Sequence, residues 1–361
     1  MKLKPYIGEP DINRLIAALR GEAVDRVPNF DVIIDDKHVE KFLGRYAGNT
    51  LAVGGDPAKG PEELEDVRPM YPKDNIELCN LIGQDAVTIE QVWTPFKKYN
   101  ELGKLIPITN RSVKKRSDWE KVIYPNQSDI DSKLFYIREY KKVLKGTKIG
   151  ITVTFGAIMQ TLYHFIIGTE DFMMLIYDDR DFLEETLEVS TQYWEKFCQS
   201  VVDEGIDFIF PADDVAFKTG LFIRPKIFKE IWIPRMARII KPAIEKNIPV
   251  MFHSCGKIDD IVIWLSEIGV NCITPMDPSG INYRDYKKRF GNLITLLGNI
   301  GVEFPLAKGT IRDVEKDVKE HMEILKPGYR YICGSSHSLI NFIPHENIIA
   351  YLNAVHKYGK Y

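Results

Sequence analysis

Residues 248–277, with the sequence IPVMFHSCGKIDDIVIWLSEIGVNCITPMD, carry the pattern that decides the expected fold. Two short, mainly apolar runs at 248–255 and 272–277 flank a stretch whose apolar side chains recur at helical spacing. Near-continuous apolar runs are typical of strands that are buried on both faces, and parallel strands of this kind are joined by helical crossovers. This stretch therefore predicts a strand, a helix and a second strand parallel to the first.

The same alternation continues along the rest of the chain. Six more runs of this type are each followed by a stretch with helical spacing: VPNFDV (27–32), DAVTIE (85–90), KIGITVTF (148–155), IDFIFPADD (206–214), LITLLGNI (293–300) and YRYICGSS (329–336). Eight such units favour a closed (β/α)8 barrel, or TIM barrel, over an open doubly wound sheet. We therefore predict an α/β protein in which residues 1–361 form a single barrel domain.

Two connections are longer than a simple crossover requires. Residues 33–84 follow the first predicted strand, and residues 91–147 lie between the second and the third predicted strands. Within the later insertion, residues 93–110 have the pattern of a β-hairpin. We expect both insertions to lie over the mouth of the barrel.

Proline and glycine mark two helix boundaries. Residues 224–247 have apolar side chains at helical spacing, but Pro234 interrupts them, so we expect two helical pieces that meet at a kink. The pattern at 279–292 predicts a helix that ends at Gly291, before the seventh strand.

The composition is that of a globular protein, with 45% hydrophobic and 27% charged residues. The net charge is −3, and lysine and arginine are scattered among acidic residues, so nucleic acid is not an expected partner. The chain has no signal-peptide pattern and no run of about 18 apolar residues, so we expect a cytoplasmic protein without a membrane segment. Formation of a homo-oligomer is left open. Five dispersed cysteines indicate thiol or metal chemistry rather than a disulfide framework.

The candidate functional residues lie at the ends of the predicted strands. In a parallel barrel the C-terminal strand ends and the loops after them converge on one open face, where catalytic groups gather. The residues at these ends are Asp31, Glu90, Thr154, Phe155, Asp213, Asp214, His253, Cys255, Asp277, Asn299 and Cys333. This set is rich in metal-binding side chains.

His253 and Cys255 are separated by one residue, so in an extended strand their side chains lie on the same side. Cys333 ends the eighth predicted strand, at the same rim of the barrel. Two thiolates and one imidazole select zinc over magnesium or calcium, and three protein ligands with one open position are typical of a catalytic zinc site. A buried cysteine is more often an inert apolar side chain, so the spacing alone leaves both interpretations open.

The chain resembles the uroporphyrinogen decarboxylase superfamily over nearly its whole length. The resemblance lies in five segments: RLIAALRGEAVDRVPNF (14–30), FPADDVAFKTG (210–220), FHSCGKIDDIVIWLSEIGVNCITPMDP (252–278), LLGNIGVEF (296–304) and ICGSSHSLINFIPHENIIAYLNAV (332–355). It implies a (β/α)8 barrel. The superfamily contains both the porphyrinogen decarboxylase and corrinoid-dependent (cobamide) methyltransferases with an H-x-C-x(n)-C zinc site.

The resemblance favours the methyltransferase branch. Residues 33–42, IIDDKHVEKF, are acidic where the decarboxylase has an arginine-rich loop, and QVWTP at 91–95 lacks the decarboxylase aspartate. His253, Cys255 and Cys333 match the positions of the three zinc ligands of the methyltransferases. The resemblance thus implies zinc as a cofactor. A corrinoid (cobalamin) would be carried by a partner protein, because the chain has no DxHxxG-type B12-binding motif.

The sequence-based hypothesis is a methyl transfer between a small methylated donor, such as a methoxyaromatic or a methylamine, and a corrinoid protein, as in an O-demethylase of anaerobic metabolism. The first alternative is a methylcobamide:thiol methyltransferase, and the second is a uroporphyrinogen decarboxylase-like decarboxylase. A barrel that binds without catalysing is the non-enzymatic alternative.

Seven further side chains are candidates for the site. The carboxylates that could protonate a leaving group or complete the zinc shell are Asp213, Asp214 and Glu90. Asp213 and Asp214 are adjacent, so at most one of these two should face the pocket. Their alternative role is to cap a turn or to pair with Lys218 or Arg224. The candidates for substrate binding are His337, His164, Trp93 and Phe155; the alternative is that they anchor loops or pack in the core.

Overall fold

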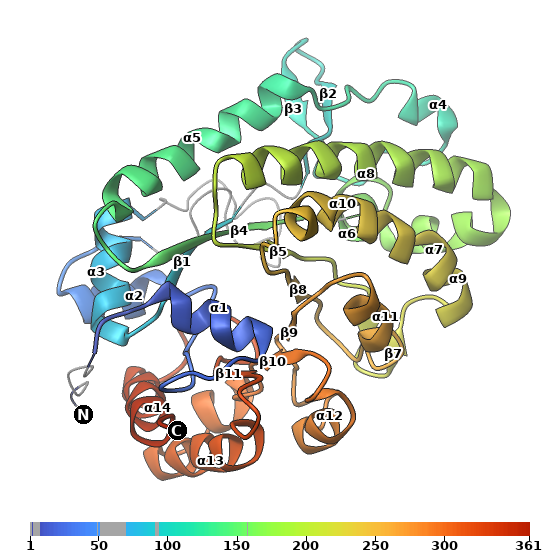
Figure 1. Ribbon diagram of the computed structural model, residues 1–361. Coiled ribbons are helices and arrows are strands. Elements are labelled where there is room, and N and C mark those ends of the chain that lie inside the picture. The colour runs from blue at the N-terminus through green and yellow to red at the C-terminus, as the bar shows by residue number, and fades with distance from the viewer. Residues whose placement is uncertain (1, 3–7, 49, 51–69, 91–93, 157) are drawn as a thin grey trace.

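The computed structural model describes residues 2, 8–48, 50, 70–90, 94–156 and 158–361 (Figure 1). Two parallel sheets form its centre, one with the strand order β1-β4-β5 and one with the order β11-β10-β9-β8. The bounds of these strands are β1 Ala86–Glu90, β4 Gly150–Phe155, β5 Phe208–Pro211, β8 Met251–His253, β9 Cys272–Thr274, β10 Thr295–Leu297 and β11 Tyr331–Ile332. Seven of the eight predicted strands are therefore confirmed, as is the α/β class with parallel strands.

Isolated contacts join these two sheets into a ring. Parallel bridges pair Ile209 with Val250 and Ala212 with His253, and so connect β5 to β8. The first predicted strand, 27–32, is the one that is not formed as a strand, and it makes only a parallel bridge from Asn29 to Cys333 beside β11. Its other edge is held to the residues before β1 by side chains: the backbone N–H of Asp31 donates to Gln84 Oε1 over 2.9 Å. The resulting strand order is the one expected for a barrel.

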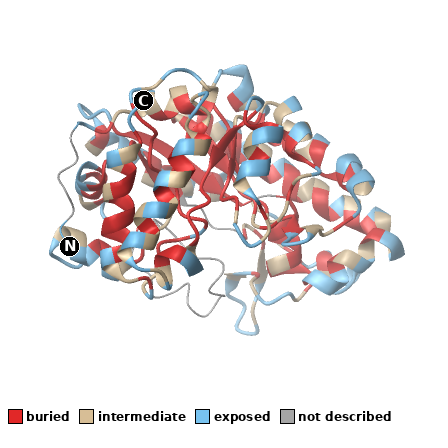
Figure 2. Cartoon of the chain, turned by 90° about the horizontal axis from the view of Figure 1, so that it is seen from below, coloured by how far each residue is buried: buried red, intermediate tan, exposed pale blue. Residues whose placement is uncertain are grey.

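Helices surround the ring, with their buried faces toward the strands and their outer faces exposed (Figures 1 and 2). Their bounds are α1 Ile12–Arg20, α2 Asp36–Leu43, α3 Pro72–Ile82, α4 Arg116–Trp119, α5 Gln127–Leu144, α6 Ile158–Gln160, η2 Thr161–Ile166, α7 Thr169–Asp178, α8 Arg180–Asp203, α9 Pro225–Ile231, α10 Ile233–Glu245, α11 Val262–Glu267, α12 Tyr283–Phe290, η3 Val302–Ala307, α13 Ile311–Leu325 and α14 His345–Tyr358. No helix among the described residues is long and apolar enough to cross a membrane.

The interior of the ring is filled by side chains from alternate strand positions. Phe208, Met251, Leu297 and Ile332 belong to one cluster of buried residues, which also includes Leu15, Ala18 and Leu19 of α1. The hydroxyl group of Thr295 donates to the backbone carbonyl of Ala18 over 2.8 Å. Helix α1 thus covers the end of the ring at which the strands begin, and leaves the other end for the cavity described below.

The predicted helix boundaries are confirmed. The stretch interrupted by Pro234 forms two helices, α9 and α10, with Pro234 in the first turn of α10. Helix α12 ends at Gly291, whose N–H bonds to the carbonyl of Lys287 over 3.0 Å. The predicted hairpin is also present, as the antiparallel pair β2 (Lys97–Tyr99) and β3 (Leu105–Pro107), joined by a single short loop.

Phe155, a predicted substrate-binding residue, belongs to the core instead. Its side chain is fully buried and stacks on Trp194 of α8, with ring centroids 5.7 Å apart, and it meets Phe197 edge-on at 5.5 Å. Successive side chains on a strand point to opposite faces, so Phe155 points outward to α8 while Thr154 points into the ring. The substrate-binding prediction for Phe155 is therefore corrected to a packing role.

We predict that Phe155→Ala lowers the free energy of unfolding by about 3–5 kcal/mol, because it removes a buried aromatic ring and leaves a cavity. Urea denaturation followed by circular dichroism measures this change. Phe135→Ala is the matched control, because that ring is 57% exposed on α5 and its loss should cost at most about 0.5 kcal/mol. Equal losses in the two variants would contradict the packing role.

Candidate metal centre

A cavity of about 370 Å³ opens at the C-terminal ends of the strands. It is lined by Phe30, Asp31, Val32, Ile33, Thr154, Gln160, Tyr163, His164, Phe210, Ala212, Asp214, His253, Cys255, Thr274, Pro275, Leu297, Ser335, His337 and Ser338. Its walls thus combine apolar and aromatic side chains with a few polar groups, as is usual for a site that binds a small molecule. No described residue of the 94–147 insertion is part of this lining, so the expectation that this insertion covers the mouth gains no support.

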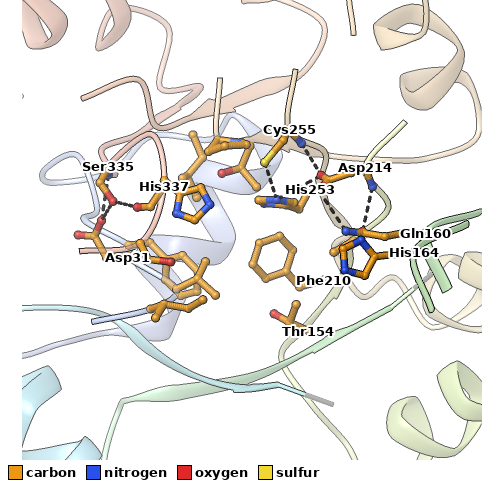
Figure 3. Close-up of a pocket in the computed structure, with 18 of the residues that line it drawn as sticks. Asp31, Thr154, Gln160, His164, Phe210, Asp214, His253, Cys255, Ser335 and His337 are labelled. Atoms are coloured by element: carbon orange, nitrogen blue, oxygen red, sulfur yellow. Dashed lines mark hydrogen bonds and ion pairs between the residues drawn. The ribbon is translucent and has the colours of Figure 1, made fainter. Parts of the chain in front are cut away.

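His253 and Cys255 converge on one point of the cavity wall, as predicted from their spacing (Figure 3). Cys255 Sγ lies 3.6 Å from His253 Nε2. Zinc binds sulfur at about 2.3 Å and nitrogen at about 2.0–2.1 Å, so tetrahedral geometry places the two ligand atoms about 3.6 Å apart. The separation fits a shared zinc ion.

Asp214 supplies a third donor at the same point. Its Oδ1 lies 3.7 Å from His253 Nε2. Within the described part of the chain, Asp214, His253 and Cys255 are the one group of three or more metal-binding side chains whose ligand atoms lie within 4.8 Å of one another. One imidazole, one thiol and one carboxylate are a donor set that zinc accepts, and a fourth position stays available for substrate.

Two residues from the segment after β4 hold Asp214 in place. Gln160 Nε2 donates to Asp214 Oδ2 over 3.1 Å, and Gln160 Oε1 accepts from the backbone N–H of Asp214 over 3.1 Å. The hydroxyl group of Tyr163 donates to the Asp214 carbonyl over 2.9 Å. The backbone N–H of Cys255 donates to Asp214 Oδ1 over 2.7 Å. These bonds fix the carboxylate next to both other ligands.

Asp213 points the other way, as expected for adjacent residues of an extended segment. It is fully buried and accepts three hydrogen bonds: from the backbone N–H groups of Met159 (3.0 Å) and Gln160 (2.7 Å), and from Trp232 Nε1 (2.6 Å). Burial raises the pKa of Asp213 to about 7, while hydrogen bonds from Trp232, Met159 and Gln160 oppose that rise. Asp213 is therefore an anchor for α6 and for the α9–α10 junction, and its predicted catalytic role is corrected.

Cys333 does not reach the cavity. It follows β11, where Ile332 points into the ring, so the Cys333 side chain points outward and is fully buried against the helical layer. Its carbonyl accepts from Tyr351 of α14 over 3.4 Å, and burial raises the pKa of its thiol. The prediction that Cys333 is a ligand alongside His253 and Cys255 is corrected, because the structure separates it from them.

The loop after β11 reaches the cavity through later residues. His337 is exposed, lines the cavity and directs its ring into it, across from His253 (Figure 3). His164 lines the cavity from η2 and is partly buried, and burial lowers the pKa of its imidazole, with Arg111 adding to the effect. Both histidines therefore stay candidates for contacts with substrate. Glu90 ends β1 beside Thr154, without a described side chain, and Trp93 lies outside the described residues.

Several polar lining residues have no assigned role in the sequence analysis, among them Asp31, Gln160 and Tyr163. Asp31 is noted there only as a strand-end acid. The signal for Asp31 was its place after VPNF, at the end of the first strand. Gln160 and Tyr163 carry no such local signal, because their contact with Asp214 joins residues more than 50 positions apart.

The uroporphyrinogen decarboxylase (URO-D) family profile matches residues 98–358, so the chain belongs to this family and the resemblance seen in the sequence is confirmed. The methylcobamide:CoM methyltransferase MtaA of Methanosarcina barkeri is 27% identical over 202 residues, which cover 55% of this chain and 56% of the relative. The chain thus spans about half the length of the MtaA proteins that it matches. A uroporphyrinogen decarboxylase of Methylobacillus flagellatus is 22% identical over 262 residues, or 69% of this chain and 71% of that protein.

Solved structures support the fold. A methyltransferase from Methanosarcina mazei superposes with a TM-score of 0.66 at 19% identity, and covers 95% of this chain and 97% of its own. A B12-independent methionine synthase from a Shewanella strain has a TM-score of 0.51 at 12% identity, covering 78% of this chain and 84% of its own. At these identities the similarity concerns the fold alone.

We predict that Cys255→Ser removes tightly bound zinc, whereas Cys333→Ala keeps it at about one ion per chain, because only Cys255 faces the ligand atoms. Elemental analysis by mass spectrometry, after dialysis against a weak chelator, measures the zinc content of each variant. The opposite result, zinc lost in Cys333→Ala and retained in Cys255→Ser, would show that the ligand set contains Cys333.

Gln160→Ala should weaken zinc binding by about 10–100-fold, since residues that orient a metal ligand contribute that much to affinity. Competition with a chromophoric chelator gives the dissociation constant. Gln192→Ala is the matched control, because that side chain is exposed on α8 and bonds only to Glu188 among the described residues. An unchanged affinity in Gln160→Ala would mean that Gln160 does not orient a zinc ligand.

Proposed function

We propose that this protein is a zinc-dependent methyltransferase, which moves a methyl group from the corrinoid of a separate protein to a small thiol. The spacing of 3.6 Å between His253 Nε2 and Cys255 Sγ, at the wall of a cavity on the barrel mouth, is the observation that carries the proposal. The relatives named as methylcobamide:CoM methyltransferases support the direction of transfer.

His253, Cys255 and Asp214 would hold the ion, and Gln160 and Tyr163 would keep Asp214 in position. When bound, zinc stabilises the thiolate form of a thiol ligand, so that a nucleophilic sulfur is present at neutral pH. The thiol proton passes to solvent. A sulfur electron pair attacks the methyl carbon, a sulfur–carbon bond forms, and the cobalt–carbon bond breaks with its electron pair left on cobalt, which goes from Co(III) to Co(I).

The cavity wall around the ligands suits this reaction. Phe210 meets the His253 ring edge-on, with centroids 6.3 Å apart, and Phe30 and Leu297 add apolar surface. Apolar walls exclude water from the attacking sulfur and strengthen the electrostatic interactions of the site. The open mouth is where a corrinoid carried by another protein would have to approach.

A second candidate uses the same site in the other direction, from a small methylated donor to the corrinoid protein. The aromatic and apolar wall formed by Phe30, Phe210 and Pro275 is compatible with a methoxyaromatic donor. A roof over the pocket, formed by the insertions at 33–84 and 91–147, would favour this direction. Ile33 of the first insertion lines the cavity, whereas none of the described residues of 94–147 does, so the described lining does not support a roof formed by the second insertion.

A decarboxylase of the porphyrinogen type is disfavoured. Such a substrate carries several carboxylates, which need basic side chains as partners. Among the described residues that line the cavity there is neither an arginine nor a lysine, and there are two aspartates, Asp31 and Asp214. This lining does not suit a polycarboxylate.

We predict that the zinc-loaded protein converts methylcobalamin and a small thiol to a thioether and a reduced cobalamin. The loss of the methylcobalamin absorbance measures the rate, and mass spectrometry identifies the thioether. Cys255→Ser should lower the rate by at least about 100-fold, since even residues behind the ligands contribute about 10–100-fold. Cys333→Ala is the control, and zinc removal followed by its return should abolish and then restore the wild-type rate.

Two outcomes would redirect this proposal. If no thiol reacts but a methoxyaromatic or a methylamine methylates a Co(I) corrinoid protein, the second candidate is correct. Turnover of a porphyrinogen by zinc-free protein would exclude both methyl transfers.

A further inference from the structure

The segment between β5 and α9 carries an exposed aromatic side chain beside the candidate metal site. This segment forms a short hairpin of two antiparallel strands, β6 (Ala216–Phe217) and β7 (Gly220–Leu221), just after Asp214. The side chain of Phe217 is 59% exposed. Phe217 is not among the residues that line the cavity, so its ring lies outside that cavity.

Hydrogen bonds attach this hairpin to the segment that carries Cys255. The backbone N–H of Lys257 donates to the carbonyl of Phe217 over 2.8 Å. At the base of the hairpin, the backbone N–H of Val215 donates to Ser254 Oγ over 3.1 Å. Two residues of chain span at most about 7 Å, so the Phe217 carbonyl oxygen lies within about 10 Å of the Cys255 Cα atom. The hairpin is therefore the part of the rim that lies next to the candidate ligands.

Two glycines allow the hairpin to lie close against the neighbouring loops. Gly256 has a φ of +86°, and a Cβ atom there would lie 2.3 Å from the carbonyl oxygen of Ala216. A Cβ atom on Gly280 would lie 2.9 Å from the carbonyl oxygen of Lys218. Any larger residue at these two positions would push the hairpin away. Close backbone packing thus fixes the position of Phe217.

A row of aromatic rings leads from the cavity wall to Phe217. Tyr163 lines the cavity and bonds to the Asp214 carbonyl. Its ring meets Phe222 edge-on, with centroids 5.6 Å apart, and the Phe222 ring lies 4.4 Å from that of Phe217. Exposure rises along the row, since Tyr163 is buried, Phe222 is half-buried and Phe217 is exposed. These rings form an aromatic surface that runs out of the cavity on the side of the candidate ligands.

The second substrate of the proposed reaction is too large for the cavity. A volume of about 370 Å³ is near the lower end of the range of about 300–1,000 Å³ that is usual for ligand pockets. It suits a small thiol, whereas a corrin macrocycle with its peripheral side chains is much larger. Attack of sulfur on the methyl carbon also requires sulfur, carbon and cobalt to lie in line. The corrin plane must therefore lie across the mouth, with its edge over the rim.

Exposed phenylalanine rings are concentrated at this end of the barrel. Four are exposed among the described residues, and three of them, Phe217, Phe304 and Phe342, lie in the segments that follow β5, β10 and β11. Within the part of the chain that the structure describes, Phe217 is the one of these three that ring contacts connect to the cavity wall. It is thus the best placed of them to contact a group that lies over the candidate ligands.

We propose that the corrin macrocycle rests on Phe217 during methyl transfer, so that the thiol binds inside the cavity and the corrin binds outside it, on the β6–β7 hairpin. This inference rests on the proposed methyl transfer from a corrinoid to a thiol, and it assigns a binding surface to the larger of the two substrates. A corrin has a conjugated ring system with methyl groups at its edge. Contact with it removes the apolar surface of the Phe217 ring from water, which favours binding.

Free methylcobalamin tests the proposal, because it presents the corrin without a partner protein. Phe217→Ala should raise the KM for methylcobalamin at least about 5-fold, which corresponds to about 1 kcal/mol of binding free energy. The kcat at saturating methylcobalamin should stay unchanged, since the ring contacts the corrin equally before and during the reaction. Phe217→Tyr keeps the ring and should retain the wild-type KM.

Two further measurements separate corrin binding from a structural role. Zinc content, from elemental analysis, and the dissociation constant of 2-mercaptoethanol, from calorimetric titration, should be the same in Phe217→Ala and the wild type, because the ring lies outside the cavity. Phe135→Ala is the matched control, since that ring is similarly exposed but lies on α5, and it should leave the methylcobalamin KM unchanged. Phe342→Ala removes an exposed ring after β11 and should also leave it unchanged.

The outcomes distinguish this inference from the function on which it rests. An unchanged methylcobalamin KM in Phe217→Ala, or a rise in Phe342→Ala alone, would overturn the assigned corrin surface while methyl transfer to thiols stands. A loss of zinc or of thiol affinity in Phe217→Ala would also overturn it, since the ring would then support the cavity itself. If the wild-type protein transfers no methyl group from methylcobalamin to any thiol, the proposed function fails, and this inference fails with it.

Discussion

The site depends on the parallel contact between β5 and β8, where the two sheets of the ring meet. The backbone N–H of Asp213 donates to the carbonyl of His253 over 3.0 Å, and Ala212 forms a parallel bridge with His253. One residue after Asp213 and two residues after His253, the N–H of Cys255 donates to Asp214 Oδ1. This register brings to one point the imidazole of His253, at the end of β8, and a thiol and a carboxylate from the short segments that follow β8 and β5. Backbone hydrogen bonds between the two segments therefore place the candidate ligands.

The adjacent aspartates show how one short segment serves both the fold and the site. The Asp213 side chain turns into the protein and accepts hydrogen bonds from the backbone N–H groups of Met159 and Gln160 and from the Trp232 indole. The Asp214 side chain turns into the cavity. Gln160 links the two, because its backbone N–H donates to Asp213 and its side chain bonds to Asp214. Asp213, which accepts from three buried donors, thus also fixes Gln160, and Gln160 orients the candidate ligand Asp214.

The architecture was largely predictable from the sequence, since apolar runs, Pro234 and Gly291 act locally. The H-x-C pair was predictable for the same reason: two residues apart on a strand share a side wherever the strand lies. The orientation of the Cys333 side chain was not predictable. It depends on which residue of the two-residue strand β11 points inward, and a shift of one position reverses that orientation. The contact between Gln160 and Asp214 forms only in the folded chain, so no local sequence pattern predicts it.

The charges of the candidate ligands explain why a cation belongs among them. Asp214 and a Cys255 thiolate would place two negative charges beside a neutral His253, and a divalent ion balances them. In the proposed reaction a substrate thiolate adds one negative charge, which methyl transfer removes, because the thioether is neutral. The transfer thus returns the site to the balance of charges that it has with the ion alone.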